Sequence, residues 1–223
     1  MHFKFACLSI ASAIALLMQE AWVPRLAFGW TSFCFAWLAL AYGVLGPRAL
    51  LKGPDGRLSW LSWLLLGPYH SLNNLCLWAA RFSREPAFHE ILPGLYLGRR
   101  LSPGQARLLS VGAVLDVTAE LSECSSFLRP GLDYRLLPTL DKRPLLPEQI
   151  AQAVEFIRSA QTPVYVHCAL GHGRSASVVA AYLIACQKVQ GVDEAETFLA
   201  KIRPQVGLTA QQKQSVQAYL ESR

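Results

Sequence analysis

The chain has 223 residues, a formal net charge of +6 and 52% hydrophobic residues, which is more apolar than one soluble domain requires and indicates a membrane-embedded part. Most of the basic excess and all six tryptophans lie in the first 85 residues. The charge therefore indicates membrane anchoring and, without a basic run or an aromatic platform, excludes a nucleic-acid partner. The six cysteines show no C-x-x-C spacing, so neither a zinc site nor a disulfide framework is expected.

Two apolar segments open the chain. Residues 26–46 carry no charge, and at about 1.5 Å per residue they match a hydrocarbon core of about 30 Å, which predicts a transmembrane helix. Residues 5–18 form a shorter apolar run behind Lys4. A signal peptide is the alternative for this run, but no small-x-small cleavage site follows it. We expect a first transmembrane helix over about residues 5–23, paired with the second in a hairpin.

A third apolar stretch, residues 58–80, is also uncharged. Gly67 and Pro68 interrupt it, and polar side chains such as Asn73 and Asn74 make its second half unfavourable in lipid. We expect an interfacial helix broken near Pro68, with a third membrane span as the alternative.

Basic residues on both flanks of this stretch indicate the sidedness, because loops rich in Lys and Arg remain in the cytoplasm. Two spans place the remainder of the chain in the cytoplasm, whereas three spans would export it. The sequence thus predicts a multi-pass membrane protein with a cytoplasmic second part.

Residues 83–90 are polar and contain a proline, as a linker does, so we expect a membrane region (1–85) followed by a second domain (86–223). Strands are predicted at residues 94–98, 113–118, 133–137 and 163–168. Helices are predicted at residues 147–160, 174–187, 193–202 and 209–220. This alternation predicts an α/β domain with a largely parallel central sheet.

The segment "VYVHCALGHGRSASVVAAYLIA" (164–185) joins a predicted strand to a predicted helix, and Cys168 lies at the turn between them. Inward-facing amides and the partial positive charge of the helix N-terminus make such a turn an anion cradle. Gly171 and Gly173 are expected to adopt positive φ angles, and Arg174 to close over the anion with two parallel N–H bonds. The same field predicts a thiol pKa below its usual value of about 8.5, so that Cys168 is a thiolate at neutral pH.

The pattern His167-Cys168-x5-Arg174-Ser175 resembles the signature of the cysteine-dependent protein tyrosine phosphatase superfamily, and is most similar to its dual-specificity branch. The resemblance extends to "ILPGLYLGRRLS", "AVLDVTAE" and "LPTLDKRPLLPEQI", and so covers most of residues 90–220. It implies a dual-specificity phosphatase-like fold with a central mixed sheet flanked by helices. With its membrane region, the chain is similar to bacterial membrane-anchored members of this branch.

The resemblance also implies residue roles. Cys168 attacks phosphorus and forms a phosphocysteine, Ser175 assists release of the thiolate, and His167 tunes the thiol through hydrogen bonds. The phosphate is held by Arg174 and by the amides of the loop, which comprises Ala169, Leu170, Gly171, His172, Gly173 and Arg174. Neither a metal ion nor another cofactor is implied.

Such a reaction needs a general acid, because an alkoxide leaves poorly without a proton. Asp141, on the proline-bounded loop "LPTLDKRP", lies where the resemblance places that acid. Asp133 is the alternative, although it precedes a strand and is more simply a turn residue. Asp116, inside "VLDVT", is expected to make structural hydrogen bonds at a strand end.

The expected function is a membrane-anchored phosphatase that hydrolyses phosphomonoesters. Its substrate is a phosphorylated protein or an anionic phospholipid, and a membrane tether serves either one. Two alternatives remain open, a catalytically silent phosphate-binding module and a rhodanese-like sulfurtransferase. The sequence does not predict the oligomeric state.

Overall fold

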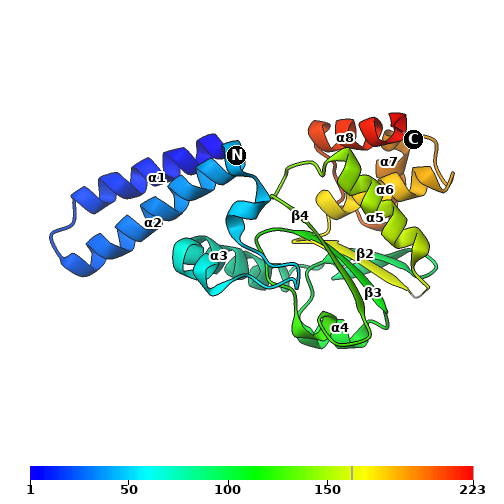
Figure 1. The fold of residues 1–223 in the computed structure, drawn as a ribbon, viewed down its shortest axis with the longest axis horizontal. Coiled ribbons are helices and arrows are strands. Elements are labelled where there is room, and N and C mark those ends of the chain that lie inside the picture. Colours follow the sequence, from blue (N-terminus) through cyan, green and yellow to red (C-terminus); the bar gives the residue numbers. More distant parts are fainter. Residues whose placement is uncertain (162, 223) are drawn as a thin grey trace.

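The computed structural model describes residues 1–161 and 163–222. A helical hairpin at the N-terminus projects from a domain in which helices cover a twisted sheet (Figure 1). The hairpin consists of α1 (His2–Leu17) and α2 (Trp22–Leu40), which is continued by the π-helical turn η1 (Ala41–Leu45). The Ser9 hydroxyl donates to the carbonyl oxygen of Ser32 at 2.9 Å and so joins the two helices near their middle.

The hairpin differs from the expected pair of spans. Within the described residues, Trp22–Leu45 is the one helix that is long and apolar enough to cross a membrane. Helix α1 has 16 residues, about 24 Å at 1.5 Å per residue, and stops well before residue 23. The predicted extent of the first helix is therefore wrong, because the chain already turns at the polar pair Gln19 and Glu20.

Helix α3 (Trp60–Ala80) is kinked where the sequence predicts a break. The backbone at Leu66 is non-helical, with φ −119° and ψ 19°, because Pro68 lacks the N–H that would bond to the carbonyl oxygen of Leu64. That oxygen instead accepts the indole N–H of Trp30 at 2.8 Å. The break near Pro68 is confirmed, and the carbonyl group that it frees holds α3 against α2.

The second part of the chain contains a five-stranded sheet in the order β1-β2-β5-β3-β4. β2, β5, β3 and β4 run parallel, whereas the edge strand β1 runs antiparallel to β2. The prediction of a mixed, largely parallel sheet is confirmed. The strands are β1 (Phe88–Leu92), β2 (Leu95–Arg99), β3 (Ala113–Thr118), β4 (Asp133–Thr139) and β5 (Val164–Cys168).

The expected linker over residues 83–90 is partly wrong. Phe88, His89 and Glu90 belong to β1 and pair with Gly98, Leu97 and Tyr96 of β2. A short edge strand owes its conformation to its pairing partner more than to its own residues, so its composition did not reveal it.

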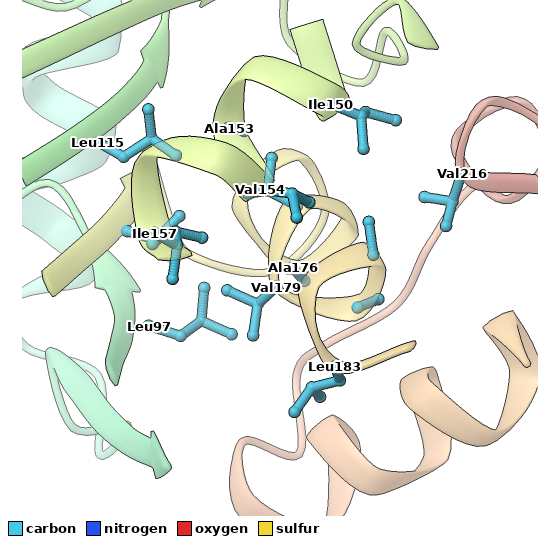
Figure 2. Packing of buried hydrophobic residues seen from close by; sticks show 14 of the residues in the cluster. Leu97, Leu115, Ile150, Ala153, Val154, Ile157, Ala176, Val179, Leu183 and Val216 are labelled. Carbon is cyan, nitrogen blue, oxygen red and sulfur yellow. The ribbon is translucent and has the colours of Figure 1, made fainter. Parts of the chain in front are cut away.

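Helices cover both faces of the sheet. Successive strand side chains point to opposite sides, and apolar side chains on each side pack against helices. Leu115 and Val166 pack on one face with Leu183 and other residues of α5 to α8, as Figure 2 shows in part. Val114 and Tyr165 pack on the other face, against α4 and η3. The helices are α4 (Pro103–Leu108), η3 (Ser125–Phe127), α5 (Pro147–Ser159), α6 (Arg174–Ala185), α7 (Val192–Ile202) and α8 (Ala210–Glu221).

The segment between the hairpin and α3 packs against the sheet. It begins with the turn η2 (Pro47–Leu50) and leads to Lys52, which is buried at the carboxyl end of β3. The Lys52 ammonium lies 2.6 Å from the carboxylate of Asp116 and donates to the hydroxyl of Thr118 at 2.9 Å. A few residues on, the carbonyl oxygen of Gly56 accepts the backbone N–H of Glu123 at 2.8 Å. The first part of the chain thus supplies interior groups to the second.

Candidate active site

The carboxyl ends of β2, β5 and β3 meet at one edge of the sheet, where Arg99 pairs with Cys168 and Asp116 pairs with His167. The chain turns after Cys168 and enters α6 at Arg174. Residues that follow these strands therefore gather around one thiol, as they do at the ligand-binding edge of other open α/β sheets.

The Cys168 thiol is buried, with 4% of the residue exposed. Its sulfur accepts the backbone N–H of Gly171 at 3.2 Å and the hydroxyl of Ser175 at 3.3 Å. Burial alone would raise the pKa of this thiol, but the charge of Arg174 and these hydrogen bonds lower the pKa below its ordinary value. The shift is in the direction that the sequence predicts, toward easier ionisation of the thiol.

Two glycines shape the loop in different ways. Gly171 has φ +78°, and a Cβ atom there would lie 2.4 Å from the backbone of Gly98, so a side chain is excluded by both conformation and space. The prediction of a positive φ is wrong for Gly173, whose φ is −118°. A Cβ atom at Gly173 would lie 3.2 Å from the side chain of Gln212, so this glycine instead leaves room for α8 to approach.

Arg203, from the C-terminal end of α7, holds the loop from outside. Its guanidinium donates to the carbonyl oxygens of Gly171 at 3.0 Å and Leu170 at 2.8 Å. With these carbonyl groups turned toward Arg203, backbone amides such as that of Gly171 face the sulfur. His172, also in the loop, lies 2.8 Å from the carboxylate of Glu85.

The guanidinium of Arg174 is buried, with 2% of the residue exposed. Its two terminal nitrogens donate to the two carboxylate oxygens of Glu120 at 2.9 and 2.7 Å. One of them also donates to the carbonyl oxygen of Thr139 at 2.7 Å, and the other to the carboxylate of Asp141 at 3.2 Å. This bidentate pairing orients Arg174 beside the sulfur.

The two candidate acids lie at opposite ends of β4. Asp141 follows the carboxyl end of the strand, is partly exposed and contacts Arg174. Asp133 begins the strand, opposite Ala113 and so at the sheet edge away from Cys168. The geometry therefore favours Asp141 as the acid.

His167 is fully buried between Glu123 and the backbone of Cys168. Its Nε2 lies 2.6 Å from the Glu123 carboxylate, and its Nδ1 lies 3.3 Å from the carbonyl oxygen of Cys168. Burial disfavours the charged imidazole, but the carboxylates of Glu123 and Asp116 outweigh it and raise the pKa of His167. The hydrogen bond between His167 and Cys168 thus involves the carbonyl oxygen of Cys168.

Asp116, Glu123 and His167 each place a ligand atom within 4.8 Å of the others, a spacing that a cation could use. The Lys52 ammonium already lies 2.6 Å from Asp116, so a side chain of the protein supplies the positive charge that balances this carboxylate. As expected, Asp116 also makes structural hydrogen bonds, because it accepts the N–H and the hydroxyl of Thr118, each at 2.7 Å.

A cavity of about 770 Å³ opens above the loop. The residues Ala169, Leu170, His172 and Gly173 form one side of it. Residues of the N-terminal part, which include Phe5, Tyr42 and Leu77, form the other side. The space available to a substrate is thus bounded by both parts of the chain.

Sequence reasoning did not assign Glu120, Glu123, Lys52 or Arg203 to this site. A signal was available for Glu120 and Glu123, because they follow a predicted parallel strand at its carboxyl end, the edge at which Cys168 also lies. Lys52 and Arg203 reach the site from segments outside the sheet, and their neighbouring residues carry no comparable signal.

Comparison with known proteins identifies the family. The family model for "Dual specificity phosphatase, catalytic domain" matches residues 95–222, more than half of the chain. Dual specificity protein phosphatase 1-B of Xenopus laevis is 30% identical over 118 residues, which cover 51% of this chain and 32% of the relative. Phosphatidylglycerophosphate phosphatase PTPMT1 of Arabidopsis thaliana is 38% identical over 90 residues, which cover 39% of this chain and 24% of the relative. The chain spans about a quarter to a third of these curated relatives.

Solved structures agree with this match. A crystal structure of PTPMT1 in complex with PI(5)P has a TM-score of 0.57 and 24% identity, and the match covers 61% of this chain and 96% of that one. A second PTPMT1 structure has a TM-score of 0.55 and 26% identity, over 60% of this chain and 94% of that one. The chain therefore belongs to the dual specificity phosphatase family, whose catalytic-domain model matches residues 95–222.

Proposed function

We propose that this protein is a membrane-anchored phosphatase that hydrolyses phosphomonoesters of proteins or lipid head groups through a phosphocysteine intermediate. The observation that carries the proposal is the buried Cys168 thiol with a lowered pKa, which accepts hydrogen bonds from Gly171 and Ser175 beside the paired guanidinium of Arg174. Relatives whose names include protein and phospholipid phosphatases support both substrate classes.

In the proposed reaction the Cys168 thiolate attacks phosphorus as the bond to the leaving oxygen breaks. Arg174 and the loop amides bind the three non-bridging oxygens, and Asp141 gives its proton to the leaving oxygen. Water then attacks the phosphocysteine and releases phosphate, with Asp141 accepting a proton from the water. Ser175 donates a hydrogen bond to the departing sulfur and so stabilises the regenerated thiolate.

The same residues bear on the alternatives. A silent phosphate-binding module would need neither an ionised nucleophile nor an acid, and this site has both Cys168 and Asp141 in contact with Arg174 or its neighbours. A sulfurtransferase would not need Asp141. Membership of the phosphatase family and the position of Asp141 favour hydrolysis over both.

Replacement of the nucleophile tests the proposal. Cys168→Ser in the full chain should lower hydrolysis of p-nitrophenyl phosphate by about 10³-fold or more, because a serine hydroxyl is not ionised in this loop. Phosphate release by the detergent-solubilised protein is the measurement, with thiosulfate as a parallel substrate for sulfur transfer.

Cys186→Ser is the matched control, since this half-buried cysteine lies at the end of α6 and should leave turnover unchanged. Equal turnover by the wild type and Cys168→Ser would contradict the mechanism. Inert wild-type protein that still binds phosphopeptides would favour the silent module.

Membrane anchoring is supported by the surface of the hairpin. Large apolar side chains point outward along both helices, with Phe3, Ile10, Leu17, Trp22 and Leu26 each more than 60% exposed. A contiguous apolar surface of this kind is unfavourable in water and favourable in lipid. We place the α1–α2 hairpin in the bilayer, with α2 as the spanning helix and the short α1 packed along it.

The exposed face of α3 carries Trp60, Trp63 and Trp78, residues that favour the interface between membrane and water. We therefore propose that α3 lies at the membrane surface and that residues 86–223 face the cytoplasm. The division into a membrane region and a second domain at residue 85 is part of this proposal.

Extraction tests the anchoring. The full chain should remain with membranes after washes with high salt and with alkaline carbonate, because burial of apolar surface is insensitive to ionic strength. Release by either wash would contradict an inserted hairpin. In sealed vesicles whose cytoplasmic face is inside, a protease added outside should digest residues 86–223 only after the membrane is permeabilised. That result would support the proposed sidedness.

A further inference from the structure

The proposed acid, Asp141, lies on a tight turn that directly follows β4. The backbone N–H of Arg143 donates to the carbonyl oxygen of Leu140 at 3.0 Å, so Asp141 and Lys142 are the two central residues of this turn. Lys142 has φ +59°, a left-handed conformation that residues with a side chain seldom adopt. Such a conformation persists only where the surroundings hold it. The position of Asp141 therefore depends on the groups that hold the turn.

One of these groups is the C-terminal end of the helix that we place across the membrane. In η1 the backbone N–H of Gly46 bonds to the carbonyl oxygen of Ala41 at 2.9 Å. The carbonyl oxygen of Tyr42 thereby loses its usual helical donor, and Pro47, the next residue, has no N–H. The guanidinium of Arg143 donates to this oxygen instead. Its positive charge also suits the partial negative charge at the end of a helix.

The first residue of the turn is held by the same helix. Leu140 is 4% exposed and packs in the buried cluster that contains Leu38 of α2 and Ala41 of η1. From the catalytic domain, the side-chain amide of Gln212 donates to the carbonyl oxygen of Arg143 at 3.4 Å, which is long for a hydrogen bond. The membrane region thus contacts both ends of the turn that carries the acid.

Arg143 and its neighbours in the turn point to different surroundings. Asp141 and Lys142 line the cavity above Cys168, whereas the guanidinium of Arg143 is bound to the carbonyl oxygen of Tyr42. Arg143 therefore acts on the reaction through Asp141 and not by contact with the substrate. A general acid must lie within hydrogen-bond reach of the leaving oxygen, and a displacement of about 1 Å can lower the rate about 10²-fold.

We propose that Arg143 is a positioning residue, which joins the acid turn to the C-terminal end of the spanning helix and so holds Asp141 at the leaving oxygen. The inference rests on the proposed phosphatase function and extends it. The hairpin becomes a condition for protonation of the leaving group as well as a membrane anchor.

Two substrates that differ in their need for a proton test this role. Phenolate has a pKa of about 10, as the tyrosine side chain does, and leaves poorly without a proton, whereas p-nitrophenolate is a much better leaving group. The full chain in detergent micelles is given phenyl phosphate and p-nitrophenyl phosphate. The measured quantity is the ratio of the two kcat/KM values, phenyl over p-nitrophenyl.

Removal of the acid sets the scale of the effect. Asp141→Asn should lower the ratio by about 10²-fold, the contribution of a general acid to departure of a poor leaving group. Arg143→Met keeps the acid but frees its turn, and should lower the ratio by about tenfold. Arg143→Lys should give a ratio closer to that of the wild type, because an ammonium can still donate to the carbonyl oxygen of Tyr42.

Arg107→Met, at an exposed arginine of α4, is the matched control and should keep the wild-type ratio. An unchanged ratio in Arg143→Met, even with slower turnover of both substrates, would overturn the positioning role while wild-type turnover upholds the proposed function. Equal ratios in Arg143→Lys and Arg143→Met would also overturn it. An unchanged ratio in Asp141→Asn would overturn the assignment of the acid and this inference together, and wild-type protein inert toward both substrates would overturn the proposed function. Because each ratio compares two substrates on one protein, partial misfolding of a variant does not alter it.

Discussion

The site depends first on single buried charges and the groups that face them. Arg174 and Glu120 are each almost fully buried and satisfy one another through two short hydrogen bonds. A guanidinium removed from water in this way needs such a partner, because an unpaired charge in the interior is strongly unfavourable. Glu120 thereby presents Arg174 next to the sulfur of Cys168, where its charge lowers the thiol pKa.

The hydroxyl of Ser175 acts on the sulfur of Cys168 through a single hydrogen bond. Its hydrogen bond to the sulfur favours the thiolate, so Ser175→Ala should raise the pKa of Cys168. Alkylation by iodoacetamide accelerates as the pH rises through the thiol pKa. In the wild type the inflection should fall below about 8.5, and in the variant it should move to higher pH. Peptide mass spectrometry of the Cys168 fragment measures the rate at each pH.

Ser110→Ala, on an exposed turn before β3, should leave the profile unchanged. If the inflection of Ser175→Ala coincides with that of the wild type, the hydroxyl does not stabilise the thiolate.

At the scale of elements, the segment after the hairpin acts as a strap across the carboxyl end of β3. Burial alone would raise the pKa of Asp116, but the ammonium of Lys52 and the charge of His167 hold that pKa at about 2. The carboxylate also accepts the hydroxyl of Tyr134 at 2.9 Å. The strap, β3 and the end of β5 at His167 therefore share one charged network.

Lys52→Met should leave the Asp116 carboxylate buried without its counter-charge and lower the free energy of unfolding by about 3–5 kcal/mol. Because the pKa of Asp116 is depressed in the folded state, the stability from this pair is present above about pH 4 and lost as the pH falls toward 2. Urea unfolding of the full chain in detergent at neutral and acid pH measures both effects.

Lys188→Met, an exposed lysine after α6, is the control and should change stability by less than about 0.5 kcal/mol. Adding Asp116→Asn to Lys52→Met should restore part of the loss, since a neutral amide needs no counter-charge. A Lys52→Met protein as stable as the wild type would show that the pair contributes nothing.

At the scale of the whole molecule, one buried cluster crosses from the helical part to the catalytic domain. Leu38 of α2, Leu50 of η2 and Leu66 of α3 pack there with Ala119 and Leu140, which follow β3 and β4. Since close-packed interiors transmit the loss of a single side chain, the two parts should unfold together.

Leu50→Ala tests this coupling. Leu50 is fully buried, so the substitution should lower the free energy of unfolding by about 2–5 kcal/mol and should also reduce protection of β3 amides in hydrogen exchange. Leu17→Ala, at the exposed tip of the hairpin, should do neither. Independent unfolding of the two parts, with β3 protection unchanged in Leu50→Ala, would contradict a shared core.

Features that depend on local pattern can be predicted from the residues alone. Short apolar runs predicted β2, β3, β4 and β5, and apolar residues at helical spacing predicted the last four helices, because residues that face the core must be apolar. The segment from Cys168 to Arg174 was predicted as a loop between a strand and a helix for a similar reason, since a strand, a tight turn and a helix N-terminus are all local. Pro68 likewise predicted the break in α3, because a missing N–H is a property of one residue.

Features that depend on distant partners appear only in the folded molecule. The edge strand β1, the length of α1, the conformation of Gly173 and the cavity wall were not readable from their own residues. Glu120 and Lys52 matter because a guanidinium and a carboxylate lie opposite them. A sequence pattern predicts which face of a helix or strand is buried, whereas only the folded molecule shows which residues pack against that face.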